Sequence, residues 1–286
     1  MQIITLTGDY GVKDHYLASL KGLIYSYVQN VQIVEISSYV RSFDVNQAAF
    51  YIESCIDDFP ENTVHLNTVG AELYIDSKYP EKSLLPGVLQ YKNQYIISFD
   101  NGFFSLFLKD KSFDNFWIAN NMEIDSSSYQ FPVKKMLIPL LISLVKKENF
   151  NKMVEKTDYF QRKINLSPVI ETNVIKGSVI HIDIYGNLIT NIDKETFYRF
   201  GNDIPFTIFF RKKEYYIDKI SKTYNEVVEG ESVAIFNSNN IMEIAINMAS
   251  NELTGGASRL LGIQIGDIVR IEFSPKGSVE NLNQLF

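Results

Sequence analysis

The stretch that decides the fold is TLTGDYGVKDHYLASLKG, residues 5–22. It begins as a strand, breaks at Gly8-Asp9-Tyr10-Gly11, and continues as a helix expected over residues 13–28, with Asp14 in its first turn. A strand that turns directly into a helix is typical of layered α/β domains. Ligands bind beyond the carboxyl ends of the strands in such sheets, so Asp9 and Asp14 are expected where a ligand would lie.

The chain divides into two parts with different sequence patterns. The first part alternates between the hydrophobic periodicities of strands and of helices. Strands are expected at 31–37 and 63–69, helices at 45–56 and 136–148, and a hairpin at 87–99 that turns at Lys92-Asn93. Short β-rich pieces separated by Gly, Asn and Asp follow from about residue 165. We therefore predict an α/β domain with a central, mostly parallel sheet at 1–165 and a smaller, barrel-like all-β domain at 166–286.

The composition excludes several classes of protein. The hydrophobic share is 45%, and no apolar run approaches the roughly 20 residues that cross a bilayer. A single cysteine, Cys55, excludes an internal disulfide, and three histidines make a structural zinc site a poor prediction. With no basic segment before IITLT, we expect a soluble cytoplasmic protein without a signal peptide. The net charge of −7 and pI of 5.1 argue against nucleic acid, and we expect no membrane partner.

The acids at the first turn suit a particular chemistry. A carboxylate beside glycines can accept hydrogen bonds from the vicinal hydroxyls of a ribose, or pair with an ammonium group, whereas it repels phosphate. The alternative is structural: Asp9 as a turn residue and Asp14 as an acid that stabilises a helix N-terminus.

Two later stretches carry polar side chains at turns. In HIDIYGNLITNI, residues 181–192, Asp183 and Asn187 flank a Tyr-Gly corner that could bind a base edge or an amino-acid head group, or could simply form a hairpin. In residues 223–247, Tyr224 could stack on a base and Asn237-Ser238-Asn239 could donate hydrogen bonds. The alternative there is a surface loop followed by a core strand.

Together these stretches resemble the S-adenosyl-L-methionine hydroxide adenosyltransferases, the DUF62 family related to fluorinase and chlorinase. ITLTGDYGVKDHYLASLKG resembles the opening TDFG-x-x-D motif of that family, and SFDNGFFSL, residues 98–106, resembles its PDNG segment. GSVIHIDIYGNLITNI resembles ID-x-FGN-x-x-TNI, and the C-terminal strands EGESVAIFNSNNIMEIAIN and ASRLLGIQIGDIVRIEF are also similar. The resemblance runs nearly from end to end.

The resemblance implies a homotrimer that holds S-adenosyl-L-methionine between neighbouring subunits, as substrate or ligand, with no further cofactor and no metal. It also implies the substrate-binding residues: Asp9 at the ribose hydroxyls, Asp14 and Asp183 at the methionine ammonium, Asn187 and Tyr224 at adenine, Phe43 over the nucleoside, and Asn237 with Ser238 at the methionine end.

The chain departs from the family where an Asp–Arg–His set is expected. HLNTVGAELY places Asn67 at the Asp position and Leu73 at the Arg position, and FPVKKMLIP places Pro132 at the His position. None of these side chains can act as a general base. His65 and Glu72 are the candidate substitutes, although a structural histidine and a solvated loop acid are the plainer interpretations.

These observations predict hydrolysis of S-adenosyl-L-methionine to adenosine and methionine, by attack of water at the ribose 5′ carbon. The sulfonium is already a strong leaving group, so alignment and desolvation could supply part of the rate. The alternatives are a non-catalytic protein that binds S-adenosyl-L-methionine or adenosine, and an enzyme that uses another nucleophile, such as a halide.

Overall fold

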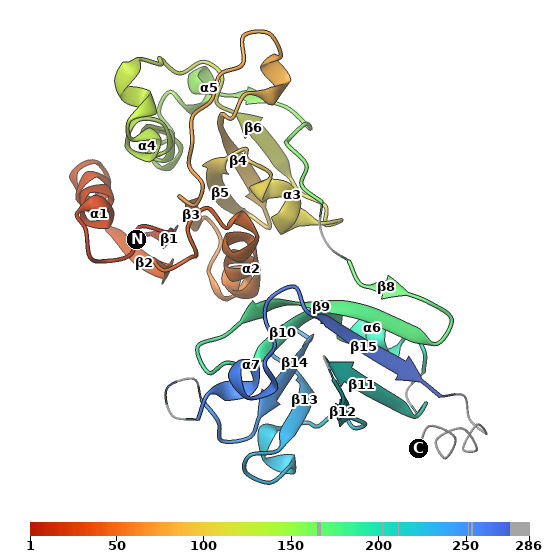
Figure 1. Cartoon of the computed structure of the whole chain (residues 1–286). Coiled ribbons are helices and arrows are strands. Elements are labelled where there is room, and N and C mark those ends of the chain that lie inside the picture. The colour runs from red at the N-terminus through yellow and green to blue at the C-terminus, as the bar shows by residue number, and fades with distance from the viewer. Residues whose placement is uncertain (165–166, 202, 211, 251, 253, 275–286) are drawn as a thin grey trace. The chain divides into compact units, whose positions relative to one another are not determined.

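The chain forms two compact units, Met1–Asn165 and Leu166–Phe286 (Figure 1). The computed structural model describes residues 1–164, 167–201, 203–210, 212–250, 252 and 254–274, and only the backbone of 212–215. Within these residues, no helix combines the length and the apolar character that a membrane span requires.

The first unit is built on a seven-stranded sheet with the order β2-β1-β3-β5-β4-β6-β7. Its strands are β1 (Gln2–Thr7), β2 (Val31–Ser37), β3 (Val64–Asn67), β4 (Pro86–Tyr91), β5 (Gln94–Phe99), β6 (Asn115–Ile118) and β7 (Glu155–Lys156). The strands from β2 to β5 are parallel neighbours, and those from β5 to β7 are antiparallel. The predicted α/β class is confirmed, with a mixed sheet in place of a mostly parallel one.

The hairpin between β4 and β5 explains the antiparallel half of the sheet. Lys92 and Asn93 both have positive φ, 49° and 58°, which is the backbone of a two-residue type I′ turn. Such a turn matches the natural twist of paired strands, so the chain reverses at the predicted position.

Helices cover both faces of this sheet (Figure 1). They are α1 (Tyr16–Tyr27), α2 (Val45–Cys55), α3 (Phe103–Leu108), α4 (Ile138–Lys146) and α5 (Phe150–Met153), with short turns η1 (Ile56–Asp58), η2 (Pro80–Lys82) and η3 (Ser126–Tyr129) and a π-helical turn η4 (Val133–Leu137). Alternate strand residues point to opposite faces. Ile4 and Leu6 therefore pack into the core under α1 and α4, whereas Leu89 and Ile96 pack under α2 and α3.

The first helix begins later than the sequence predicted. Gly11 has a φ of 65° and donates its N–H to the Ser38 carbonyl at 2.7 Å, so the chain is still turning there. The helix starts only at Tyr16, after His15. Asp14 consequently lies in the turn before α1, where it is exposed, and not in the first turn of the helix.

The segment after β5 ties distant parts of the first unit together. Asp100 is 4% exposed, and its two carboxylate oxygens accept the Gln161 N–H at 3.0 and 2.9 Å. Burial raises the pKa of Asp100 to about 6. Asn101 donates its side-chain amide to the Gly70 carbonyl at 2.9 Å. This Asp-Asn-Gly segment therefore anchors the loop that follows β3.

The second unit is an eight-stranded sheet whose named strands pair only in the antiparallel sense. Its main path is β12-β11-β15-β9-β10-β14-β13, with β8 beside β9. The strands are β8 (Val169–Ile170), β9 (Val174–Ile182), β10 (Leu188–Asp193), β11 (Phe206–Phe210), β12 (Lys212–Ile217), β13 (Ser232–Phe236), β14 (Ile241–Ile246) and β15 (Ile268–Phe273). A bridge between Ile220 and Ala234 brings the two ends of the path together, which confirms the barrel-like prediction.

The interior of the second unit is apolar and rich in aromatic rings. Phe197 is 2% exposed and meets Phe206 and Phe273 with ring centroids 4.9 and 5.4 Å apart. Short helical turns in the described part of this unit are α6 (Lys194–Tyr198), η5 (Tyr224–Glu226) and α7 (Gly256–Leu261).

Replacing Asp100 by Asn should remove a pH dependence of stability. The raised pKa means that the folded chain binds this proton more tightly, so the free energy of unfolding falls as pH rises from about 4 to about 6, by up to about 3 kcal/mol. The Asn carbonyl can still accept the Gln161 N–H but carries no charge. Urea unfolding of both proteins across this pH range should show a falling free energy of unfolding in the parent alone. The same pH dependence in both proteins would contradict the raised pKa of Asp100.

Candidate functional site

The turn after β1 is fixed by close packing. Gly8 donates its N–H to the Ser37 carbonyl at 2.8 Å, and its own carbonyl accepts the Val40 N–H at 3.1 Å. A Cβ atom at Gly8 would lie 2.6 Å from Thr68 Oγ1, so no other residue fits without displacement. This packing places Asp9, half-buried, at the carboxyl edge of the parallel strands.

Asp9 holds a strained aromatic residue. Its Oδ2 accepts the Phe43 N–H at 2.9 Å, and Phe43 has a φ of 65° although it is not a glycine. Its side chain is 79% exposed. An aromatic ring that is left in solvent on a costly backbone is a feature of ligand-binding sites more than of cores. The structure therefore brings Asp9 and Phe43 together.

An aromatic cluster connects this turn with Pro132. The ring of Phe131 meets Tyr10 at 6.0 Å and Tyr16 at 5.7 Å, both edge to face. Burial and, less strongly, the charge of Asp9 raise the pKa of Tyr10. Pro132 directly follows Phe131 and precedes the π-helical turn η4, a type of irregularity that is frequent at functional sites.

Asn67 is fully buried at the end of β3, with both ends of its amide in use. Its Nδ2 donates to Ser98 Oγ at 3.0 Å, and its Oδ1 accepts the Val69 N–H at 3.2 Å. Thr7 lies opposite Asn67 on β1, and in the described part of the chain its Oγ1 is the one buried side-chain N or O atom without a hydrogen-bond partner. An unpaired buried hydroxyl is costly unless a water or ligand satisfies it.

His65 belongs to the interior of the sheet. Its Nδ1 lies 2.8 Å from Thr5 Oγ1 and its Nε2 lies 2.7 Å from Gln94 Oε1, whose amide nitrogen donates to the Ile56 carbonyl at 3.0 Å. The Gln94 oxygen can only accept, so Nε2 carries the proton and Nδ1 accepts from Thr5. Burial lowers the pKa of His65, which keeps the imidazole neutral.

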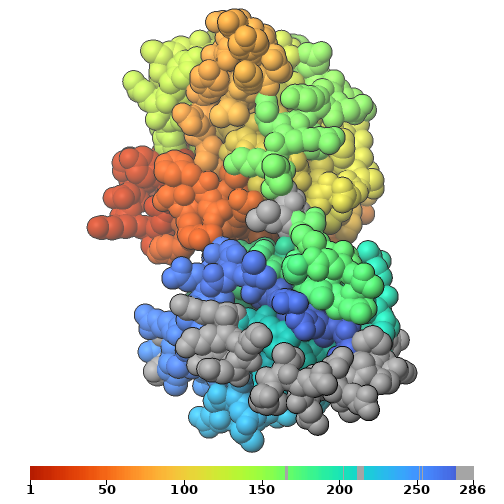
Figure 2. Space-filling view, turned by 45° about the vertical axis from the view of Figure 1, so that its right-hand side comes forward, coloured from red at the N-terminus to blue at the C-terminus, as the bar shows by residue number. Residues whose placement is uncertain are grey.

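Leu73, at the expected Arg position, and Glu72, a candidate substitute base, lie in different environments. Leu73 is 5% exposed and packs into the apolar core under α1 and α4. Glu72 is exposed, on the segment between β3 and β4 that is coloured orange in Figures 1 and 2. Glu72, His65 and Asn67 therefore occupy three different environments, namely solvent, the strand interior and the strand end.

In the second unit, Asp183 and Asn187 form one hydrogen-bonded corner between β9 and β10. Asp183 Oδ1 accepts the N–H groups of Tyr185 and Asn187 at 2.9 and 2.8 Å, and Oδ2 accepts Asn187 Nδ2 at 3.1 Å. Gly186, with a φ of 84°, makes the tight turn possible. The corner is thus both the hairpin turn and a fixed pair of polar side chains.

The start of α7 packs against the back of this corner. Ser258 donates its N–H to the Gly186 carbonyl at 2.9 Å. A Cβ atom at Gly256 would lie 2.3 Å from the Tyr185 carbonyl oxygen, so the backbone can approach this closely only at a glycine.

Glu243, which sequence reasoning missed, connects the other predicted residues. The Tyr224 hydroxyl donates to Glu243 Oε1 at 2.6 Å, and Asn237 Nδ2 lies 3.4 Å from Oε2. Glu243 is 4% exposed. Burial raises its pKa, as does the nearby charge of Asp183, while the hydrogen bond from Tyr224 and the amides of Asn237 and Asn187 act in the opposite sense. Asp183, Asn187, Tyr224 and Asn237 therefore surround one buried carboxylate.

The sequence did contain a signal for this residue. Glu243 is the lone acid in the apolar strand MEIAI, between Met242 and Ile244, which are both fully buried. A charged residue is rarely buried without partners, so an acid at such a position predicts a polar cluster over that strand. Ser238, by contrast, is exposed in the turn between β13 and β14.

The two polar regions favour binding chemistry. Each unit presents carboxylates and a ring, and the second unit adds amides, which suits a ligand with hydroxyl groups, a positive charge and a planar base. Among the described residues, no group of three or more His, Cys, Asp or Glu side chains is arranged to hold a metal ion. The fold and these corners define a protein of one α/β unit and one barrel-like unit, each with a polar corner whose chemistry suits a small polar ligand.

The comparisons identify the family. The chain belongs to the S-adenosyl-L-methionine (SAM) hydroxide adenosyltransferase family, whose N-terminal domain model matches residues 4–154 and whose C-terminal domain model matches residues 177–270. It is 26% identical over 283 residues to a Methanocaldococcus jannaschii protein named (R)-S-adenosyl-L-methionine hydrolase, covering 95% of this chain and 96% of the relative.

Solved structures share the fold. An uncharacterized conserved protein from Thermotoga maritima superposes with a TM-score of 0.80 at 24% identity, covering 94% of this chain and 99% of the other. A conserved hypothetical protein from Thermus thermophilus gives a TM-score of 0.68 at 17% identity, covering 96% of this chain and 100% of the other.

Changing Gly256 to Ala should disturb the Asp183–Asn187 corner. The new methyl group would meet the Tyr185 carbonyl, on a backbone with a φ of 58°. Gly230 is a matched control, because it also has a positive φ, 85°, but has open space around it. We expect Gly256→Ala to lower the free energy of unfolding by about 2 kcal/mol more than Gly230→Ala, as measured by denaturant titration. If both variants lose the same free energy of unfolding, the backbone around Gly256 can make room for the methyl group without cost.

Proposed function

We propose that this protein binds S-adenosyl-L-methionine and hydrolyses it to adenosine and methionine. The family membership and the name of the Methanocaldococcus relative support the substrate and the reaction. The observation that carries the proposal is the cluster around Glu243, in which Asp183, Asn187, Tyr224 and Asn237 are held in one polar corner.

In this proposal the cluster binds the adenine and the amino-acid end. The Tyr224 ring is 38% exposed, and its hydroxyl is fixed by Glu243, so one face can stack on the base. The Asn187 amide nitrogen donates to Asp183, which leaves its oxygen to accept a hydrogen bond from an exocyclic amino group. Asp183 and Asn237 with Ser238 would then meet the methionine portion.

The first unit would supply the ribose and nucleoside contacts. Asp9 accepts one backbone N–H through Oδ2, so its other oxygen can accept from ribose hydroxyls. The exposed Phe43 ring, attached directly to this hydrogen bond, would cover the nucleoside. Asp14, exposed in the same turn, would face the methionine ammonium.

The chemical step needs little from the protein. A water oxygen bonds to the ribose 5′ carbon, the bond from that carbon to the sulfonium sulfur breaks, and its electron pair stays on the neutral thioether of methionine. The attacking water releases one proton to solvent. Asn67 cannot accept that proton, because its amide is not a base, so alignment and desolvation carry the reaction. We therefore expect turnover to be slow.

A second candidate is a binding protein without turnover. It is favoured by the buried state of the expected catalytic positions: Asn67 is hydrogen-bonded at both ends, His65 is held between Thr5 and Gln94, and Leu73 lies in the core. The polar corner around Glu243 serves binding in either case.

Calorimetry and product analysis separate the two candidates. Titration with S-adenosyl-L-methionine should show saturable binding, and chromatography after long incubation should show adenosine and methionine in equal amounts. Binding without adenosine would support the second candidate, and adenosine that also forms in a protein-free sample would not count as turnover. Neither candidate survives if the protein binds neither S-adenosyl-L-methionine nor adenosine.

A variant of Glu243 tests the site itself. Glu243→Gln keeps the size of the side chain but replaces a charge-assisted hydrogen bond from Tyr224 with a neutral one, so affinity should fall by about tenfold, equivalent to about 1.4 kcal/mol. Glu231→Gln is the control, since it removes an exposed acid of the same unit. If both variants bind S-adenosyl-L-methionine with the same affinity as the parent, and their circular dichroism is unchanged, Glu243 does not belong to the site.

We further propose that the two polar regions meet across a homotrimer, one from each of two neighbouring copies. The family resemblance in the motifs around Asp9 and Asp183 supports this arrangement. Sedimentation velocity should then give three times the 32.8 kDa chain mass. A protein that stays monomeric while it binds S-adenosyl-L-methionine would contradict the shared site without contradicting binding.

A further inference from the structure

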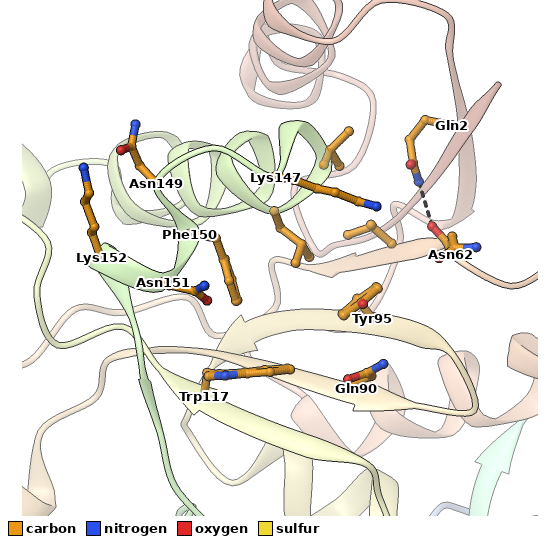
Figure 3. Close-up of a pocket in the computed structure, with 13 residues that line it drawn as sticks. Gln2, Asn62, Gln90, Tyr95, Trp117, Lys147, Asn149, Phe150, Asn151 and Lys152 are labelled. Atoms are coloured by element: carbon orange, nitrogen blue, oxygen red, sulfur yellow. Dashed lines mark hydrogen bonds between the residues drawn. The ribbon is translucent and has the colours of Figure 1, made fainter.

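A large cavity lies in the first unit, at the edge where β1, β3 and β5 begin (Figure 3). Its volume is about 780 Å³, within the range of small-molecule sites. Its lining residues are Gln2, Asn62, Val64, Gln90, Tyr95, Trp117, Leu144, Val145, Lys147, Asn149, Phe150, Asn151 and Lys152. Asp9 lies beyond the opposite end of β1, which is about 17 Å long, so this cavity is separate from the proposed substrate site.

Three aromatic side chains form walls of the cavity. Trp117, on β6, and Phe150 meet with ring centroids 5.6 Å apart at 78°, and Tyr95 lies on β5, which β4 separates from β6. In Figure 3 these rings face the space below the end of α4. The aliphatic Leu144 and Val145 also line the cavity. All of them are only partly buried, so their free surfaces are available to a planar ring.

Two amides fix the polarity of the cavity lining. Gln90 Oε1 accepts Asn115 Nδ2 at 2.7 Å, which leaves the Gln90 nitrogen as a donor. Gln2 Nε2 donates to the carbonyls of Ile3 and Asn62 at 2.8 and 2.9 Å, which leaves the Gln2 oxygen as an acceptor. A ring with both donors and acceptors on its edge matches this arrangement better than a hydrocarbon does.

The charge of the cavity is positive. Lys147 and Lys152 are the charged residues among those that line it, no acid lines it, and neither lysine forms an ion pair within the described chain. The Lys147 side chain extends across the cavity toward Gln2 (Figure 3). The Lys147 ammonium, which forms no ion pair in the described chain, therefore favours an anion in this cavity.

We propose that this cavity is a binding site for a nucleoside monophosphate. The base lies against Trp117 beside Phe150, its edge meets Gln90 and Gln2, and the phosphate pairs with Lys147. This site is independent of the proposed hydrolysis, because none of these residues belongs to the S-adenosyl-L-methionine site.

The chain offers a direct reporter, because Trp117 is its only tryptophan. Adenosine 5′-monophosphate should quench the emission of Trp117 saturably when tryptophan alone is excited. Adenosine lacks the phosphate and ribose 5-phosphate lacks the base, so each should bind at least about tenfold more weakly. Quenching should persist with S-adenosyl-L-methionine present, since the two sites are separate.

Two lysine variants provide the decisive comparison. Lys147→Gln removes the proposed phosphate partner and should weaken adenosine 5′-monophosphate by about tenfold. Lys146→Gln changes its chain neighbour, which lies over the Tyr27 ring and does not line the cavity, and should have no effect. Calorimetry of the parent with adenosine 5′-monophosphate would detect binding that does not change the fluorescence. The proposal is overturned if neither method shows saturable binding, if adenosine binds as tightly, or if Lys147→Gln leaves the affinity unchanged.

Discussion

The parallel half of the first sheet depends on hydrogen bonds between buried polar side chains. Thr5, His65 and Gln94 join β1, β3 and β5 in one row, and Asn67 joins Ser98 in the next row. These residues all point to the face under α2 and α3. A shift of one residue in any strand would move them into the apolar core on the other face, so the row fixes the register. The strand ends, and with them Asp9 and the loop after Asn67, are positioned as a consequence.

The second unit also depends on hydrogen bonds between buried polar side chains, in a smaller cluster. A buried carboxylate such as Glu243 costs free energy unless hydrogen bonds replace its lost water, and Tyr224 and Asn237 provide them. The corner formed by Asp183 and Asn187 is likewise complete before any ligand arrives. Side chains held in this way lose little freedom on binding, so the interaction energy is not consumed by ordering them.

Local patterns predicted much of the fold, and the parts that they missed have identifiable physical causes. Residues 31–37 and the turn at Lys92-Asn93 occur where alternation and turn chemistry predicted them, but the same turn makes half of the sheet antiparallel, which strand periodicity alone cannot reveal. The corner between β9 and β10 was visible as a motif, whereas the lining of the cavity beside Trp117 comes from separate stretches of the chain. Burial of Glu243 depends on Tyr224, nineteen residues away. Periodicity describes a strand by itself, and a loop elsewhere in the sequence decides whether its outer face is buried.

The residues expected at the family's catalytic positions are integrated into the fold. The Asn67 amide closes two hydrogen bonds at the end of β3, Leu73 fills space in the apolar core, and Pro132 precedes the π-helical turn η4. A charged side chain at position 73 would be buried among aliphatic groups without a partner, which costs several kcal/mol. A catalytic set therefore cannot be restored by one substitution, since the surrounding core would have to change with it. Under the proposed function, turnover would accordingly come from how the ligand is held, and the prearranged corner around Glu243 would be central to it.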